Sequence, residues 1–266
     1  MDFSFDTSAL KMLNESYYLL LRDRREESAN NVLTNVADYW RGATPQSWVS
    51  NIFLDDPPIE LTGMPDAAMS RTELHQYLQS DPNPHRALAA ILAWGGTGYR
   101  ARDHISSTWS DWVMTFHALK GKRSEAQYTH YLKATKERSL RGLGPAFFTK
   151  IIFFTAGEES PGYILDQWTA RSANALTNDN TFIRLNPEQR VVQPDGILRP
   201  RGFIVSSRNS PERYARFNRL VEAVADNLGC SPEHAELIMF SKATFWRAYL
   251  VQRANENRNL SLEMTS

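Results

Sequence analysis

The stretch 140–166 constrains the fold more than any other part of the chain. It contains Gly142 and Gly144 with one apolar residue between them, and Pro145 follows at once. Glycine adopts positive φ readily and lets bare backbone approach a ligand, and proline suits the first turn of a helix. Residues 146–156 are apolar enough to form that helix. We therefore predict a hairpin between two helices, with exposed amides that bind one anion.

Positive charge is concentrated around this hairpin, although the whole chain has a net charge of zero. Residues 120–150 contain eight Lys or Arg and two acids, a local excess of +6. Residues 55–81 contain one basic and six acidic residues, a local excess of −5. Because phosphate binding requires nearby cations, this distribution favours a nucleic-acid ligand at the hairpin.

An aspartate follows the hairpin helix. Asp166 comes 22 positions after Gly144, directly after the apolar pair Ile164-Leu165. This arrangement resembles the helix-hairpin-helix DNA glycosylases, and most closely a bacterial branch related to 8-oxoguanine DNA glycosylases. In that superfamily the hairpin grips a DNA phosphate, and an Asp at a similar distance beyond it serves base excision. The resemblance implies double-stranded DNA as partner, with contacts from Arg141, Gly142, Leu143, Gly144 and Lys150.

The resemblance makes Asp166 the catalytic residue. Breaking an N-glycosidic bond gives the sugar oxocarbenium character, so a carboxylate near C1′ stabilises the developing charge and orients or deprotonates water. Aspartate is also a common N-cap, and residues 167–176 read as a helix. The two roles of Asp166 are not exclusive.

Lys150 is the second candidate catalytic residue. Glycosylases of this superfamily that also cleave the backbone carry a Schiff-base lysine two positions after the second hairpin glycine. Ala146 occupies that position here, which favours a monofunctional enzyme that uses water. Lys150 lies one helical turn further on about the same face, where it could reach phosphate, Asp166 or the sugar. Its alternative role is that of a surface lysine on an apolar helix.

The extruded base needs a pocket, and aromatic residues supply such walls. Trp94 and Trp168 are the candidates for base pocket or wedge. Trp94 ends an apolar helix before a glycine-rich turn, and in the family such a turn presents wedge residues to the duplex. The alternative is a glycine C-cap after a buried helix. The resemblance implies an oxidised purine as target, and a related possibility is an anti-phage glycosylase that removes a modified base such as glucosylated hydroxymethylcytosine.

The periodicity of the chain predicts a mainly α fold, with two lobes around a cleft in a single domain over 1–266. A segment rich in Pro and Gly, 178–208, reads as a small irregular or β insertion. The loop-rich connection 44–66 contains a short strand at Ser50 to Leu54 in this interpretation. Ser70 and Glu73 form a capping-box pattern. We expect helices at 10–25, 31–41, 70–79, 85–94, 107–119, 124–139, 146–156, 167–176, 211–227 and 232–252.

Composition limits the cofactors and the location. Cys230 is the only cysteine, which excludes a disulfide framework and a four-cysteine iron–sulfur cluster. We expect no metal and no cofactor apart from a monovalent or divalent cation at the hairpin. The N-terminus lacks a signal sequence and no apolar run is long enough to span a membrane. We therefore expect a monomer in the cytoplasm, associated with the nucleoid.

Two other classes of protein stay open. Helix-hairpin-helix units also occur in non-catalytic DNA-binding modules, where the hairpin only clamps phosphate, and such a module does not require Asp166. A helical scaffold that does not touch nucleic acid fits the neutral net charge but leaves the hairpin and its basic surroundings unexplained.

Overall fold

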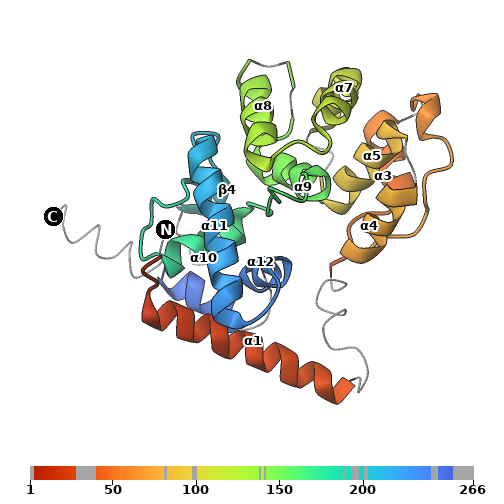
Figure 1. Ribbon diagram of the computed structural model, residues 1–266. Helices are drawn as coiled ribbons and strands as arrows, with labels where there is room; N and C mark the ends of the chain where they lie inside the picture. Colours follow the sequence, from red (N-terminus) through yellow and green to blue (C-terminus); the bar gives the residue numbers. More distant parts are fainter. Residues whose placement is uncertain are drawn as a thin grey trace. The chain divides into compact units, whose positions relative to one another are not determined.

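The computed structural model shows a mainly helical protein, which confirms the predicted fold class (Figure 1). It describes residues 3–27, 40–54, 56–80, 83–97, 101–137, 139–140, 142–187, 190–192, 198–200, 203–240 and 245–253. None of the helices in these ranges is long and apolar enough to cross a membrane.

The chain divides into two compact units. The hairpin unit comprises the described residues of Thr34–Leu165 and Ser206–Asn218, and the Asp166 unit comprises those of Met1–Leu33, Asp166–Val205 and Arg219–Ser266. One boundary falls between Leu165 and Asp166, and another falls within helix α11 (Pro211–Leu228), which begins in the hairpin unit and ends in the Asp166 unit.

The hairpin unit contains helices and no strand in its described residues. Its elements in chain order are α3 (Pro45–Phe53), the short 3-10 helix η1 (Ile59–Leu61), α4 (Arg71–Ser80), α5 (Pro84–Trp94), α6 (Arg102–Ser107), α7 (Trp109–Leu119), α8 (Ser124–Lys136), α9 (Pro145–Thr155) and the first part of α11.

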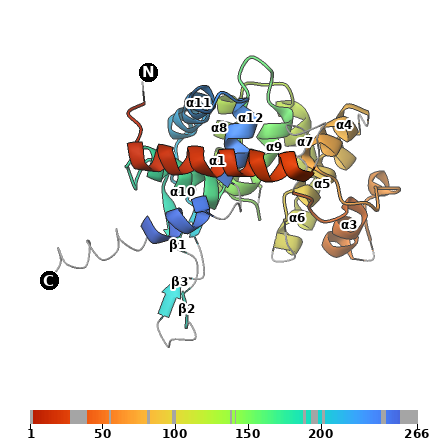
Figure 2. The ribbon, with the colours of Figure 1, turned by 90° about the horizontal axis from the view of Figure 1, so that it is seen from below.

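Helix α5 is the centre of the hairpin unit. It packs against α3, α4, α7 and α9, so every residue from Ala87 to Trp94 is buried. A helix that is apolar on all sides is stable only in such a position. Asn83 begins it, because the side-chain oxygen accepts the His85 amide at 2.9 Å, and Pro84 occupies the first turn. Figure 2 shows α3, α5 and α6 gathered at one end of this unit.

The predicted strand at Ser50–Leu54 is wrong, because α3 occupies this segment (Figure 2). The Thr44 hydroxyl accepts the Ser47 amide at 3.1 Å and caps the helix, and Pro45 fits the first turn. The buried residues that follow, Trp48, Val49 and Ile52, have the spacing of one helical face. Proline can start a helix as well as interrupt one, and Pro45 starts α3.

The predicted capping box at the start of α4 is confirmed. The Glu73 amide donates to the Ser70 hydroxyl at 3.2 Å, and the Glu73 carboxylate accepts the Ser70 amide at 2.7 Å, so the capping box at α4 is complete. The predicted helix at 31–41 lies largely outside the described residues, and its last two residues, Trp40 and Arg41, are not helical.

Stacked aromatic rings hold α9 in the hairpin unit. Tyr131 of α8 is fully buried, and its ring stacks on Phe148 of α9 at 5.7 Å and on Trp112 at 5.8 Å between centroids. Burial raises the pKa of Tyr131 well above its usual value. Tyr128 adds an edge contact to Phe148 at 5.1 Å. The helix that follows the hairpin is therefore seated on a rigid core.

The Asp166 unit is built around α10 (Gln167–Leu176). This helix packs against α1 (Thr7–Glu27), α12 (Pro232–Phe240) and strand β4 (Phe203–Val205). The buried Ser172 hydroxyl donates to the Met239 carbonyl at 2.7 Å and accepts the Trp246 indole N–H at 2.8 Å. These two hydrogen bonds connect a further helix, 245–253, to α10 and α12 in the core of the unit.

The insertion 178–208 contains two small antiparallel sheets, which confirms the prediction of a small β insertion. Strand β1 (Leu185–Pro187) pairs with β4, and Leu185 lies opposite Val205. Strands β2 (Arg190–Val192) and β3 (Leu198–Pro200) pair with each other, with Arg190 opposite Pro200 (Figure 2). Of the helix predicted at 232–252, residues 232–240 and 245–252 are helical and 241–244 lie outside the described residues.

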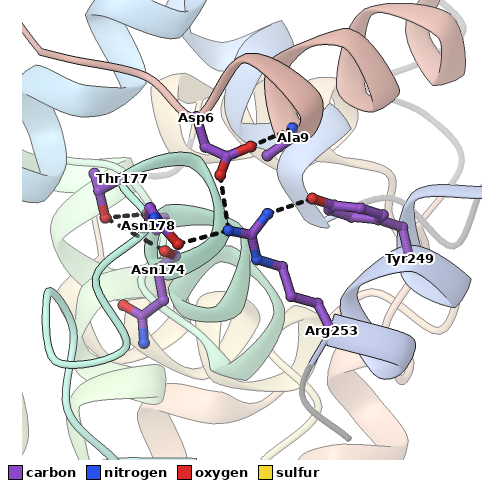
Figure 3. A network of polar contacts seen from close by, with 8 residues as sticks. Asp6, Ala9, Asn174, Thr177, Asn178, Tyr249 and Arg253 are labelled. Atoms are coloured by element: carbon purple, nitrogen blue, oxygen red, sulfur yellow. Dashed lines mark hydrogen bonds and ion pairs between the residues drawn. The ribbon is translucent and has the colours of Figure 1, made fainter. Parts of the chain in front are cut away.

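In the Asp166 unit, a polar network around Arg253 connects residues that are far apart in the chain (Figure 3). The guanidinium donates to Asp6 at 2.8 Å, to Asn178 at 2.6 Å and to the Tyr249 hydroxyl at 2.5 Å. The other oxygen of Asp6 accepts the Ala9 amide at 2.8 Å and caps α1. The hydrogen bond from Arg253 is the main reason why the pKa of Asp6 lies below its usual value.

We expect Asp6→Asn to lower the free energy of unfolding by about 1–3 kcal/mol at pH 7, because it removes a charge-assisted hydrogen bond and keeps the cap. The folded-state pKa of Asp6 is lowered, so its contribution is complete above the unfolded pKa of about 4. It is lost as the pH falls through the folded pKa. Urea unfolding at pH 7 and pH 3 measures this difference.

The control for this prediction is Glu15→Gln, which removes an exposed pair with Lys11 at 3.9 Å and should change stability little at either pH. A gap between wild type and Asp6→Asn that stays the same at both pH values contradicts the linkage.

Candidate active site and phosphate-binding hairpin

The two hairpin glycines have different structural roles. Gly142 has a φ of +87°, and a Cβ there would lie 3.1 Å from the His104 Cβ and 3.2 Å from the Ala101 Cβ. Both its conformation and its packing against the start of α6 therefore require glycine. Gly144 has an extended φ of −92° and is the N-cap of α9. Apart from its chain neighbours, no described residue has an atom within 4 Å of a Cβ placed there. The second glycine faces open space.

The open side of the hairpin presents backbone donors. Among the described residues, none accepts a hydrogen bond from the amides of Leu143, Gly144 or Ala146. Leu143 is itself only 3 % exposed, so its side chain anchors the turn. The positive end of the α9 dipole points the same way as these amides. The hairpin is therefore suited to an anion. Arg141, the predicted cationic contact, lies outside the described residues.

Lys150 closes the end of α5. Its ammonium donates to the Gly95 carbonyl at 2.5 Å, and it lies 5.3 Å from the centre of the Phe147 ring. A cation is favourable at the C-terminus of a helix. This contact assigns Lys150 a structural role in the hairpin unit that the sequence does not reveal.

Trp94 is buried beside this helix end, with 5 % of its surface exposed. Its ring packs edge-on against Phe154 at 5.2 Å, and its carbonyl accepts the Trp40 indole N–H at 3.0 Å. Gly95 follows as the C-cap and Gly96 has a φ of +70°. This geometry is that of a glycine-capped buried helix, and in it the Trp94 ring contacts protein rather than solvent.

The segment that leads to Asp166 is fixed on the hairpin unit. The Thr149 hydroxyl of α9 accepts the Leu165 amide at 3.1 Å. The Tyr163 amide donates to the Asn218 side chain at 3.3 Å, and the Tyr163 carbonyl accepts the Tyr214 hydroxyl at 3.0 Å. Residues 162–165 are all buried. The backbone is therefore held in place up to the residue before Asp166.

Asp166 is the N-cap of α10, with only 9 % of its surface exposed. Its Oδ1 accepts the Trp168 amide at 2.7 Å and the Thr169 amide at 3.0 Å. The Asp166 amide donates to the Thr169 hydroxyl at 2.9 Å, which completes a capping box. No described residue donates a hydrogen bond to Oδ2. The cap therefore uses one carboxylate oxygen, and the other has no donor among the described residues.

Trp168 lies half-buried on the first turn of α10, under two guanidinium groups. The Arg247 guanidinium carbon is 4.1 Å from the centre of its ring, and that of Arg171 is 4.9 Å away. Sequence reasoning missed Arg247, because no motif marks it and its position in helix 245–253 is remote in the chain. Thr149 was missed too, since a buried threonine in an apolar helix gives no signal.

A mainly helical chain with an amide-lined hairpin, followed by a buried N-capping aspartate, is of the helix-hairpin-helix DNA glycosylase type. The family model described as "Putative 8-oxoguanine DNA glycosylase OGG-like protein" matches residues 30–240. Since this match covers most of the 266 residues, the chain belongs to that family. No curated protein and no solved structure matches the chain. No group of three or more His, Cys, Asp or Glu in the described residues could hold a metal ion.

Proposed function

We propose that the protein extrudes a damaged or modified base from duplex DNA and hydrolyses its N-glycosidic bond, leaving an abasic site. The observation that carries this proposal is the position of Asp166. A carboxylate with one oxygen fixed by two backbone amides and the other without a hydrogen-bond donor among the described residues is rigid and still able to react. A residue that served only as a cap would be equally effective as Asn or Ser.

In this mechanism the hairpin amides hold a phosphate and position the duplex. Asp166 stabilises the positive charge that develops on the sugar as the bond to the base breaks. A water molecule then adds to C1′ and gives its proton to the carboxylate. Trp168 serves as a wall of the base pocket in this proposal, because its backbone amide binds the same carboxylate.

The proposed enzyme is monofunctional. Ala146 replaces the lysine of the lyase-type relatives, and the Lys150 ammonium donates to the Gly95 carbonyl. We therefore expect no covalent enzyme–DNA adduct after borohydride reduction during turnover. Denaturing gel electrophoresis measures this, with an abasic-site lyase as positive control. An adduct that forms with wild type and disappears in Lys150→Ala would make Lys150 a nucleophile.

The substrate is tested with two panels of DNA. One contains duplexes with oxidised purines, as the family description implies, and the other is genomic DNA from phages with modified bases such as glucosylated hydroxymethylcytosine. Mass spectrometry identifies released bases, and alkali cleavage detects abasic sites. Release from the second panel alone assigns the protein to phage defence. Binding without release from either panel favours a non-catalytic DNA-binding module. A cytoplasmic location at the nucleoid belongs to the same proposal.

A further inference from the structure

Arg247 is a half-buried cation with one donor that no described residue accepts. Its Nη2 donates to the Phe240 carbonyl at 2.9 Å, at the end of α12. Its Nε is buried and has no hydrogen-bond partner among the described residues. A buried donor usually finds an acceptor within the protein. The described residues therefore satisfy the hydrogen-bonding capacity of this guanidinium only in part.

The surroundings hold this guanidinium firmly. It lies 4.1 Å from the centre of the Trp168 ring and 5.3 Å from that of Phe240. The preceding residue, Trp246, is fully buried and donates to Ser172 of α10 at 2.8 Å. Helix 245–253 thus presents Arg247 from a rigid element, as a preorganised functional group requires.

The Asp166 carboxylate acts on the charge of Arg247. Burial lowers the pKa of Arg247, and the Asp166 carboxylate opposes this effect. The two opposite charges therefore interact, although no salt bridge joins them within the described residues. A half-buried cation that interacts with a nearly buried carboxylate is a candidate for a functional site.

We propose that Arg247 is a catalytic residue that stabilises the leaving base, an inference that rests on the proposed function. When the C1′–N bond breaks, its electron pair stays on the base, so the base becomes anionic while the sugar becomes cationic. Asp166 matches the positive charge and Arg247 matches the negative one. Water adds to C1′ and loses one proton to Asp166, and the base anion takes one proton from solvent. The products are the abasic sugar and the neutral base.

This pairing defines the class of base that the site favours. A guanidinium donates to carbonyl oxygens and ring nitrogens that accept hydrogen bonds, as it does to the acceptor edge of guanine. Bases whose anion spreads onto carbonyl oxygens, such as 8-oxoguanine, gain most from it. An aminopurine without a carbonyl gains least.

The test compares Arg247→Met, which removes the charge, with Arg247→Lys, which keeps it. Both variants lose the guanidinium that donates to the Phe240 carbonyl. A difference in rate between them therefore reports the effect of the positive charge alone. The probe is a duplex with 8-oxoguanine opposite cytosine, or the modified base that wild type releases. The single-turnover rate should fall roughly 100-fold in Arg247→Met and should recover in part in Arg247→Lys. The Kd for a 2′-fluoro analogue, which resists cleavage, should stay the same.

Arg171→Met is the matched control, because it removes another guanidinium over the same Trp168 ring and should keep most of the rate. If Arg247→Met does not unfold cooperatively, Arg247→Gln gives the same comparison. Equal rates in the Met and Lys variants overturn the proposal, and so does a loss that lies only in Kd, which would make Arg247 a phosphate contact. If wild type releases no base, the proposed function fails and this role fails with it.

Discussion

Asp166→Asn is expected to slow single-turnover base release by about 1000-fold or more, because the charge that stabilises the oxocarbenium ion disappears. Asparagine keeps a side-chain oxygen that accepts the Trp168 and Thr169 amides, so α10 stays capped. The variant should therefore unfold at nearly the wild-type temperature and bind DNA with nearly the wild-type Kd. Rapid-quench assays of abasic sites, with enzyme in excess over DNA, measure the effect.

The matched control is Asp179→Asn, also in the Asp166 unit. Asp179 accepts the Thr181 amide at 2.8 Å in an exposed turn, so it shares the backbone-capping role of Asp166 without the buried position. Its replacement should leave base release unchanged. If Asp166→Asn releases the base as fast as wild type, Asp166 is only a cap and the catalytic carboxylate lies elsewhere.

The helix starts that depend on residues within one turn of the chain could be predicted from the sequence. The starts of α4, α9 and α10 each depend on a residue that acts on the next three positions: Ser70 with Glu73, Pro145 after Gly144, and Asp166 with Thr169. Such signals lie within one turn of the chain, so reading them requires no knowledge of tertiary contacts. The misreading of α3 shows the limit, since proline begins helices as well as loops.

Tertiary contacts decide the environment of the candidate site residues. These contacts cannot be read from local patterns in the sequence. The apolar run of α5 predicts a buried helix, yet nothing in it shows that the Lys150 ammonium donates to the Gly95 carbonyl. A tryptophan before a glycine-rich turn fits a wedge residue. The structure instead buries the Trp94 ring against Phe154. The position of Arg247 over Trp168 depends on how helix 245–253 packs on α10. Only packing distinguishes these residues from the other aromatic and basic residues.

The two hairpin glycines allow a sharper test of DNA binding than either alone. We expect Gly144→Asp to weaken the Kd for duplex DNA by about 100-fold, because a carboxylate would stand in the open space before the α9 amides and repel phosphate. The dependence of log Kd on log salt should become less steep by about one unit, since one phosphate contact is lost. Gel-shift titrations at several salt concentrations measure both quantities, and all base sequences should be affected alike.

Stability distinguishes this effect from damage to the fold. Apart from its chain neighbours, no described residue has an atom within 4 Å of a Cβ at Gly144, and its φ of −92° suits any residue. The melting temperature of Gly144→Asp should therefore remain close to that of wild type. Gly142→Ala is the contrasting variant. Its φ of +87° and its close contacts with Ala101 and His104 should lower the free energy of unfolding by about 1–3 kcal/mol. If Gly144→Asp binds DNA as tightly as wild type with the same salt dependence, the hairpin does not hold a phosphate, and the glycosylase proposal loses its DNA clamp.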